Sequence, residues 1–293
     1  QGKLIYLGDK KSTSDNNQIS YIEFHKKYFE QIKNMIFNPN LITKYSSIIK
    51  LGYSGTHGTG YPLVSKLLSE LGFTNVKYIS QTIKPNYFFP SFSLTQMLDP
   101  SDHTSAEIIV KEFINQYGIN DFKNLDLLCF TDPDADRLGV IINVPKREKS
   151  LYGPWKLLKA NDIWTLLLWY MLEIISKRSD LFSSVLSKMF IVKNFVTTDA
   201  LTYTCKKYGV DCIDGKVGFS DLTTIVQKYW TEGKINIGMF EESSGFGIAG
   251  NPLFPELKSH ILEKDGILTL ILITEIVAYA KSINTTISQL LDD

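Results

Sequence analysis

The chain has 293 residues, and its 31 lysine and arginine residues balance 31 aspartate and glutamate residues. With no net charge, it lacks the basic excess typical of nucleic-acid-binding proteins. Hydrophobic residues make up 44% of the chain, which is enough for packed cores, and a chain of this length commonly forms two domains. Three cysteines without metal-type spacing argue against a disulfide framework and favour a reducing, cytoplasmic location.

The first part of the chain predicts alternating helices and strands. Residues 1–18 are polar and are expected to form a linker or loop. Apolar residues then recur at helical spacing over 21–35. A strand over 48–53, a helix over 62–71 and a strand over 76–79 follow, which is the order that builds parallel sheets.

A glycine-rich turn, Ser54 to Gly60, connects the first of these strands to its helix. Such a turn can cradle an anion at the start of a helix, or its glycines can simply permit a tight bend. His57 is the residue in it that is suited to a polar role. After it, residues 81–103 show no periodicity and are expected to form a long surface excursion, with a helix over 105–117 behind it.

Three carboxylates, Asp132, Asp134 and Asp136, alternate between two apolar strands predicted over 125–130 and 138–144, and Arg137 closes the run. Placing three negative charges so close together is costly unless a cation neutralises them. Carboxylate oxygens are ligands that Mg²⁺ prefers. The pattern therefore favours a magnesium site, with Arg137 able to pair with a carboxylate or a phosphate.

Other interpretations of this loop remain open. It could be an acidic surface turn, because Asp, Pro and Arg are common in loops. It could also be the loop of a haloacid-dehalogenase-like phosphatase, with Asp132 as the nucleophile, although Asp136 and Arg137 fit that pattern poorly. An EF-hand is excluded, because Arg137 stands where a glycine is required and Asn143 where a glutamate is required.

The second half repeats the alternation of strands and helices. A polar, turn-rich stretch over 146–154 predicts a domain boundary, which divides the chain into domains 19–150 and 151–293. Beyond it we expect helices over 161–175, 199–208, 221–230 and 267–280 and strands over 189–193, 210–213 and 236–240. The apolar runs of 163–175 and 267–280 each contain a glutamate and fall short of the roughly 20 residues that a membrane span needs. No membrane segment is therefore predicted.

The last of these strands leads into the stretch Glu241 to Gly247, which holds two carboxylates, two serines and two glycines. Carboxylates accept hydrogen bonds from neighbouring hydroxyls, and serines both donate and accept them, so this loop suits a polyol such as a sugar. Alternatively, it is an ordinary solvated loop.

Together these motifs resemble the α-D-phosphohexomutases, the phosphoglucomutase and phosphomannomutase superfamily. Residues 132–137, with the sequence DPDADR, resemble the family's metal loop, and the turn at residues 54–60 resembles its TxMHGxG stretch. The EESSG loop resembles its sugar-recognition loop, with Glu242 and Ser244 on the residues that contact sugar hydroxyls. Residues 216–219 resemble another turn of the same cleft, which carries Lys216 and Gly218. Phe246 stands where some members have a histidine.

The resemblance implies two consecutive three-layer α/β domains with mixed, mainly parallel sheets, the second and third of the family's four. It implies Mg²⁺ as the cofactor and transfer of a phosphoryl group between the 1- and 6-hydroxyls of a hexose phosphate through a bisphosphate sugar intermediate. Arg137 would help to neutralise the transferring group, and Lys216, Gly218 and His57 would line the substrate cleft.

The family's phosphoserine loop, T-A-S-H-[NK]-P, does not occur in the 293 residues, and the chain begins with Gln1. We therefore expect the middle of a longer enzyme, lacking the first domain and the fourth, phosphate-clamping domain, and inactive alone. A non-catalytic sugar-phosphate-binding or regulatory homologue is the alternative. The sequence leaves the choice among glucose, mannose and pentose phosphates open.

Overall fold

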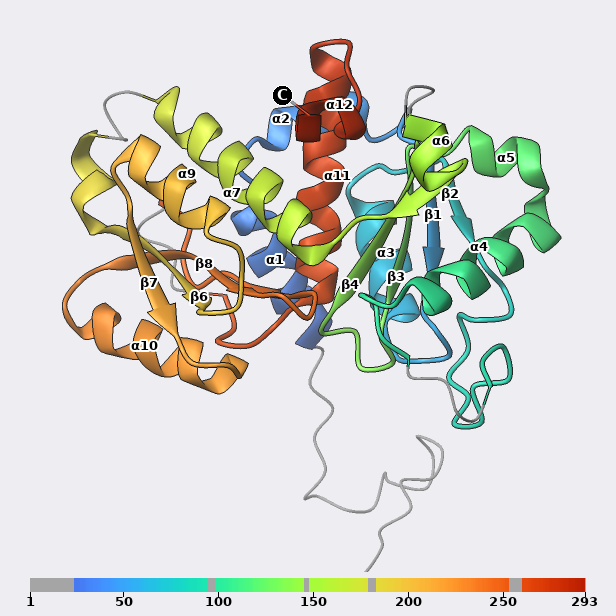
Figure 1. Cartoon of the computed structure of the whole chain (residues 1–293), viewed down its shortest axis with the longest axis horizontal. Helices are drawn as coiled ribbons and strands as arrows, with labels where there is room; N and C mark the ends of the chain where they lie inside the picture. Colours follow the sequence, from blue (N-terminus) through green and yellow to red (C-terminus); the bar gives the residue numbers. More distant parts are fainter. Residues whose placement is uncertain (1–23, 94–97, 145–147, 179–182, 253–259, 293) are drawn as a thin grey trace, which may run out of the picture.

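The computed structural model describes residues 24–93, 98–144, 148–178, 183–252 and 260–292, and their elements form two α/β units side by side (Figure 1). The predicted linker over 1–18 and the first residues of the predicted N-terminal helix lie outside the described residues.

The first unit is built on a five-stranded sheet. Its strand order is β2 (Val76–Tyr78), β1 (Leu51–Ser54), β3 (Leu127–Thr131), β4 (Leu138–Asn143) and β5 (Trp155–Leu157). The strands β2, β1 and β3 run parallel, whereas β4 and β5 each run antiparallel to the preceding strand. The helices around this sheet are α1 (Phe24–Met35), α2 (Pro39–Tyr45), α3 (Tyr61–Glu70), α4 (His103–Tyr117), α5 (Ile119–Lys123) and α6 (Lys149–Tyr152).

The second unit is built on a four-stranded sheet in the order β7 (Asp211–Gly215), β6 (Met189–Asn194), β8 (Ile235–Glu241) and β9 (Gly245–Gly247). Its first three strands are parallel and β9 is antiparallel. The remaining helices are α7 (Ala160–Ser176), the short 3₁₀ helix η2 (Leu186–Lys188), α9 (Ala200–Tyr208), α10 (Phe219–Thr231), α11 (Gly266–Ser282) and α12 (Ile287–Asp292).

Helices cover both faces of each sheet. Successive side chains of a strand point to opposite faces, so neighbouring residues of one strand pack against different helices. In β3, Leu127 and Cys129 join the core shared with α3 and α11, whereas Leu128 and Phe130 pack against α4 and α5. In β6, Ile191 likewise faces the core shared with α7 and α9, whereas residues on the opposite face pack against α10. Each unit therefore has three layers, and the predicted fold class of two α/β units with mixed sheets is confirmed.

Helix α11 stands between the two sheets (Figure 1). It contacts β3, β4 and α2 of the first unit and α7 and β9 of the second, and most of its 17 residues are buried. One continuous hydrophobic core consequently extends through both units. Although α11 is apolar, no helix in the described residues is both long and hydrophobic enough to cross a bilayer.

The structure differs from the sequence prediction at several short elements. Strand β5 lies beyond residue 150, where the sequence predicts the domain boundary, yet it pairs with β4 and thus belongs to the first sheet. The domain boundary at residue 150 stays a prediction, although the first sheet continues to Leu157. The elements α2, α5, α6, β9 and α12 were also not predicted, because segments of three to seven residues show no clear period by themselves. The equally short strand β2 was predicted from its place after a strand and a helix, which is the order that builds parallel sheets.

Glu275 lies fully buried in the middle of α11 and joins three parts of the chain. Its carboxylate accepts hydrogen bonds from the backbone N–H groups of Phe37 and Asn38, at 3.1 and 2.5 Å, and from the Tyr170 hydroxyl at 2.7 Å. Burial raises the pKa of this carboxyl to about 7, because a buried charge loses its hydration. Glu275 thereby holds the turn between α1 and α2, as well as α7, against the central helix.

This raised pKa predicts a pH-dependent stability. Between an unfolded pKa of 4.5 and a folded pKa of about 7, the folded state binds more protons than the unfolded state. Stability from this group is therefore present at low pH and is lost as the pH rises through about 7. From about pH 8 to about pH 5, the wild type should gain roughly 2 kcal/mol of unfolding free energy relative to Glu275→Gln, which cannot titrate. Urea unfolding of both proteins measures this difference, and a difference independent of pH would contradict the assignment.

Candidate functional site

Three carboxylates meet in the loop between β3 and β4. The side-chain oxygens of Asp132, Asp134 and Asp136 lie within 4.8 Å of one another, and Ala135 between them adopts a φ of 64°. Asp132 is only 2% exposed, whereas Asp134 is exposed and Asp136 is half-buried. This convergence is the one that the sequence predicts for a metal loop.

Two cations neutralise part of this charge. The Arg137 guanidinium donates to the Asp132 carboxylate at 2.7 Å, and the backbone N–H of Arg137 donates to the same carboxylate at 3.1 Å. The guanidinium also lies 3.4 Å from Asp99, and Lys264 lies 3.0 Å from Asp136. Burial still raises the pKa of Asp132 to about 6, although the hydrogen bonds from Arg137 act in the opposite direction. A divalent cation would relieve the remaining repulsion.

Two of these charged residues, Asp99 and Lys264, could not be assigned to the site from the sequence. Asp99 comes from the predicted surface excursion, and Lys264 lies just before α11, far from the loop in the sequence. Only the folded chain brings them to the three carboxylates. A pocket of about 430 Å³ opens beside them and is lined by Asp134, Asp136, Lys264 and residues of α1.

The glycine-rich turn supports the carboxylate loop directly. The Thr59 N–H and hydroxyl both donate to the carbonyl of Pro133, at 2.8 and 3.1 Å. A Cβ at Gly58 would lie 2.1 Å from that same carbonyl oxygen, so only glycine allows this close approach. The turn therefore lies beside the carboxylates and shapes their loop.

His57, however, makes its side-chain contacts with the segment that follows the first strands rather than with the carboxylate loop. Its ring is buried edge-on against Phe89 and Phe92, and its Nε2 lies 3.0 Å from the Ser91 hydroxyl. Burial lowers the pKa of this histidine, because the protonated ring would lose its hydration. In this arrangement His57 holds the segment 86–92 against the turn, and its binding of substrate stays a prediction.

The Glu241 to Gly247 loop is fastened to the carboxylate loop. Arg137 and Gly245 form an isolated antiparallel bridge, and the Leu138 N–H lies 3.5 Å from the carbonyl oxygen of Ser244. Ser244 is buried with a φ of 68°, which makes a sharp turn possible before β9. Residues more than 100 positions apart in the sequence thus share one site.

Asn194 orients Glu242 from the neighbouring strand. Its Nδ2 donates to the Glu242 carboxylate at 2.6 Å, while its Oδ1 accepts from the Thr197 N–H at 3.0 Å. The sequence did not single out Asn194, since a polar residue after a strand is common. Phe246, by contrast, is fully buried against Trp164 and belongs to the core.

Lys216 and Gly218 follow β7 at the same edge of the sheet as Asn194 and Glu242, because β6, β7 and β8 are parallel. Lys216 is exposed and its N–H donates to the Asp221 carboxylate at 2.7 Å, and Gly218 begins α10 with a φ of 112°. In parallel sheets, ligands commonly bind beyond the carboxyl ends of the strands.

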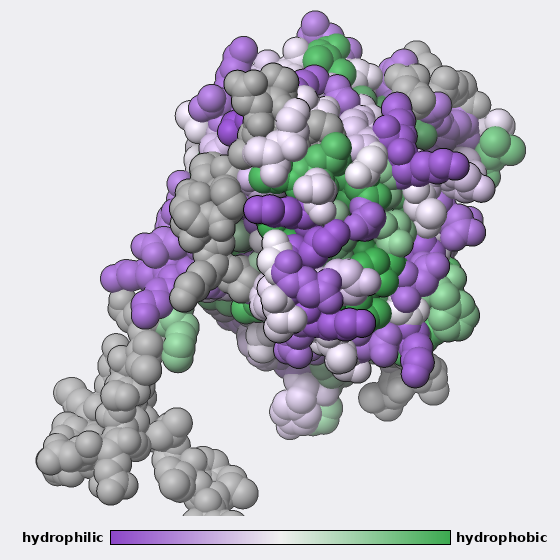
Figure 2. Space-filling view, turned by 90° about the vertical axis from the view of Figure 1, so that its left-hand side faces the viewer, coloured by the Kyte–Doolittle hydropathy of each residue, from purple (hydrophilic) through white to green (hydrophobic). Residues whose placement is uncertain are grey.

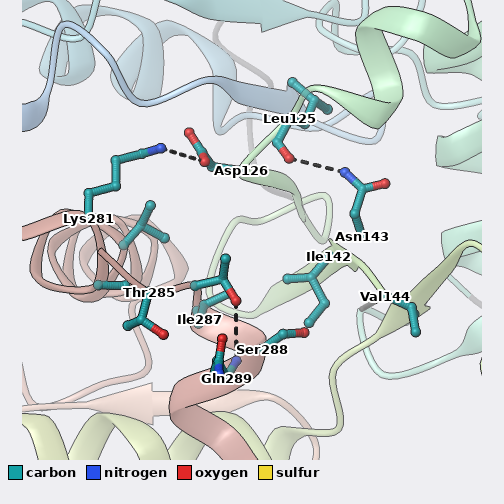
Figure 3. Close-up of a pocket in the computed structure, with 13 residues that line it drawn as sticks. Leu125, Asp126, Ile142, Asn143, Val144, Lys281, Thr285, Ile287, Ser288 and Gln289 are labelled. Atoms are coloured by element: carbon teal, nitrogen blue, oxygen red, sulfur yellow. Dashed lines mark hydrogen bonds and ion pairs between the residues drawn. The ribbon is translucent and has the colours of Figure 1, made fainter. Parts of the chain in front are cut away.

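A larger pocket of about 510 Å³ lies at the opposite end of the β3–β4 hairpin (Figure 3). It contains an ion pair of 2.7 Å between Lys281 and Asp126, and the Asn143 amide donates to the Leu125 carbonyl at 3.1 Å. Since Asp126 precedes β3 and Asn143 ends β4, this pocket is separate from the carboxylate loop at the other end of both strands.

The two α/β units are consistent with domains of the α-D-phosphohexomutase superfamily. Residues 26–144 match the family model for alpha/beta/alpha domain II of phosphoglucomutase/phosphomannomutase, and residues 160–293 match the model for domain III. The chain belongs to the phosphoglucomutase/phosphomannomutase family.

Individual relatives agree with this assignment. The chain is 28% identical to a phosphoglucomutase of Staphylococcus aureus (strain USA300) over 219 residues, which cover 75% of this chain and 34% of that protein. Its fold is similar to that of a Thermus thermophilus protein assigned as a phosphomannomutase, with a TM-score of 0.63 and 21% identity over 92% of this chain and 50% of the other. It is also similar to Aspergillus fumigatus N-acetylphosphoglucosamine mutase solved with GlcNAc-6P and magnesium, with a TM-score of 0.54 and 14% identity over 96% and 56% of the two chains. The chain thus spans about a third of the curated relative and about half of these structures.

The contact between Gly58 and Pro133 predicts the effect of a single methyl group. Gly58→Ala should lower the unfolding free energy by about 2 kcal/mol or more, because its Cβ must push the carboxylate loop away. Gly55→Ala in the same turn is the matched control, since its Cβ would meet neighbours at an ordinary 3.6 Å. Thermal and urea unfolding compare the two variants, and equal stability would show that the turn does not support the loop.

Proposed function

We propose that this chain is the central part of a Mg²⁺-dependent phosphohexomutase that interconverts hexose 1-phosphate and hexose 6-phosphate through a phosphoserine. The observation that carries the proposal is the convergence of Asp132, Asp134 and Asp136 at the end of β3, next to the Glu241 to Gly247 loop. We further propose that the phosphoserine and the phosphate clamp belong to other parts of a longer cytoplasmic enzyme. The limited share of the S. aureus phosphoglucomutase that the chain spans supports this inference.

The donor set of the loop fits Mg²⁺. Its three carboxylates supply hard oxygen ligands, and in the described residues they form ion pairs with two cations, Arg137 and Lys264. Asp132, Asp134 and Asp136 would hold the ion, which when bound stabilises negative charge on a phosphoryl group. The magnesium complex of the A. fumigatus mutase supports the choice of metal.

Arg137 and Lys264 supply the positive charge that belongs to the chain itself. Arg137 is oriented by Asp132 and Asp99, so its guanidinium is held in place at the carboxylates. A planar guanidinium suits the oxygens of a phosphoryl group. Arg137 would neutralise the negative charge of the phosphoryl group during transfer. Because its carboxylate partners already fix its position, the Arg137 side chain would lose less conformational entropy when the substrate binds.

The Glu241 to Gly247 loop would bind the sugar. A carboxylate repels a phosphate dianion but accepts hydrogen bonds from sugar hydroxyls, so Glu242 would select the neutral part of the substrate. Ser244 would contact the same hydroxyls, and Lys216 and Gly218 would line the same cleft.

A non-catalytic sugar-phosphate-binding homologue is the second candidate. It would keep the metal and sugar loops and would contain no phosphoserine loop anywhere in its full sequence. The haloacid-dehalogenase-like phosphatase loses its support, because both family models that match the chain belong to mutases.

The first prediction from this function concerns the metal. Asp134→Ala should abolish Mg²⁺ binding and leave the fold intact, because Asp134 is exposed and supplies a ligand rather than a core contact. Isothermal titration calorimetry with Mg²⁺ measures the binding, and circular dichroism checks the fold. Asp162→Ala removes another exposed carboxylate, away from this loop, and should bind Mg²⁺ like the wild type. Unchanged binding by Asp134→Ala would exclude this loop as the metal site.

The second prediction concerns the binding of the sugar. In the complete enzyme, Glu242→Gln should weaken hexose-phosphate binding about tenfold or more, because hydrogen bonds to a charged acceptor become neutral ones. Mg²⁺ binding should stay unchanged. Glu232→Gln, at an exposed position after α10, is the matched control. If the Glu242→Gln enzyme binds and turns over hexose phosphate normally, Glu242 does not contact the sugar.

The third concerns the 293 residues alone. They should fold but should not convert glucose 1-phosphate to glucose 6-phosphate in the presence of Mg²⁺ and a bisphosphate primer. The reason is that they contain no serine in the required loop, so no covalent route joins the two hydroxyls. A coupled assay for glucose 6-phosphate measures turnover. Activity that disappears on replacing Ser54, or another serine of this chain, would place the nucleophile within these residues instead.

A further inference from the structure

Two cysteines face each other at the edge of the second unit, away from the residues assigned to the proposed function. Cys205 lies on α9 and Cys212 on β7, which is the edge strand of its sheet. The side of the molecule that this unit forms exposes hydrophobic residues between hydrophilic ones (Figure 2). Cys205 is only 1% exposed, whereas Cys212 is half-buried and so reaches the surface.

The geometry places the two thiols next to each other. The Thr202 hydroxyl lies 3.5 Å from the Cys212 sulfur, and Thr202 is one helical turn before Cys205, on the same side of α9. Helix α9 packs against β7, and Cys205 and Cys212 both border the core between these two elements. Both residues are free cysteines in the structure.

The surroundings favour a thiolate on Cys212. Hydrogen bonds from Cys205 and Thr202 and the positive charge of Lys193 lower its pKa, although burial and the charge of Asp214 act against them. Lys193 on β6 is in register with Asp214 and lies 2.8 Å from its carboxylate, so it shares the face on which Cys212 lies two residues earlier. A thiolate rather than a thiol is the reactive nucleophile.

The other two thiols have the opposite character. The hydrogen bond to Cys212 and burial raise the pKa of Cys205, which keeps its proton. Burial likewise raises the pKa of Cys129, which lies fully enclosed in β3. Cys212 therefore has the properties of an attacking thiol, and Cys205 those of a resolving thiol next to it.

We propose that Cys212 and Cys205 form an oxidation site, in which a peroxide oxidises Cys212 and Cys205 then closes a reversible disulfide between β7 and α9. This site is independent of the proposed mutase reaction. In a reducing compartment such a pair stays reduced at rest and forms a disulfide only transiently.

The chemistry balances with hydrogen peroxide as the oxidant. The Cys212 thiolate attacks one peroxide oxygen, the O–O bond breaks, and the products are a sulfenic acid and hydroxide, which takes up a proton to become water. The Cys205 sulfur then attacks the Cys212 sulfur, an S–S bond forms, and the sulfenic hydroxyl leaves as water with the Cys205 proton. Two thiols and one peroxide thus give one disulfide and two waters.

Mass spectrometry of the reduced chain treated with hydrogen peroxide tests the proposal. The intact mass should fall by two hydrogen atoms, and dithiothreitol should restore it. Lys206 and Lys207 lie between the cysteines, so trypsin separates the two peptides unless a disulfide joins them. The Cys205→Ser variant should stop at a sulfenic acid on Cys212, which dimedone traps, whereas Cys212→Ser should leave Cys205 reduced. Cys129→Ser is the matched control and should behave like the wild type.

A second measurement does not depend on the folding of any variant. Limited alkylation of the wild type at neutral pH should modify Cys212 first, at a rate at least about tenfold above those of Cys205 and Cys129. The proposal is overturned if the wild type keeps all thiols under peroxide, if Cys129 forms the disulfide, or if Cys212 is not the fastest thiol to be alkylated.

Discussion

The mutual repulsion of three carboxylates held within 4.8 Å is the constraint on which the rest of this structure depends. At the end of β3, one of them, Asp132, is also buried, which adds a desolvation penalty. The chain meets this cost with Arg137 inside the loop and with Lys264 from just before α11. Such a cluster persists only because its surroundings hold it in place.

Close backbone contacts supply that support. Gly58 approaches Pro133 from one side, and Gly266, at the start of α11, approaches Ala135 and Arg137 from the other. The Gly266 N–H donates to the Ala135 carbonyl at 3.1 Å. Because α11 is buried between both sheets, the second unit fixes a loop that the first unit carries. The metal and sugar loops are thus held in one frame by the shared core.

The sequence predicted the long elements and the convergent carboxylates but little of what joins them. Helices α4 and α7 run over four or more turns with an apolar face, α11 is a long run of almost entirely apolar residues, and the three aspartates alternate within five residues. Strands β5 and β9 have three residues each and carry no such signal. Asp99, Lys264 and Asn194 reach the site only through tertiary contacts, and the burial of His57 against Phe92 is likewise not visible in the sequence.

The central claim is that the Asp132 to Asp136 loop is a divalent metal site formed by this chain alone. The most direct test is the anomalous scattering of Mn²⁺ in crystals of the chain, since Mn²⁺ replaces Mg²⁺ at sites of oxygen ligands. We predict one strong anomalous peak among the carboxylates of Asp132, Asp134 and Asp136. A Mn²⁺ peak bound elsewhere, with this loop empty at saturating metal, would contradict the account.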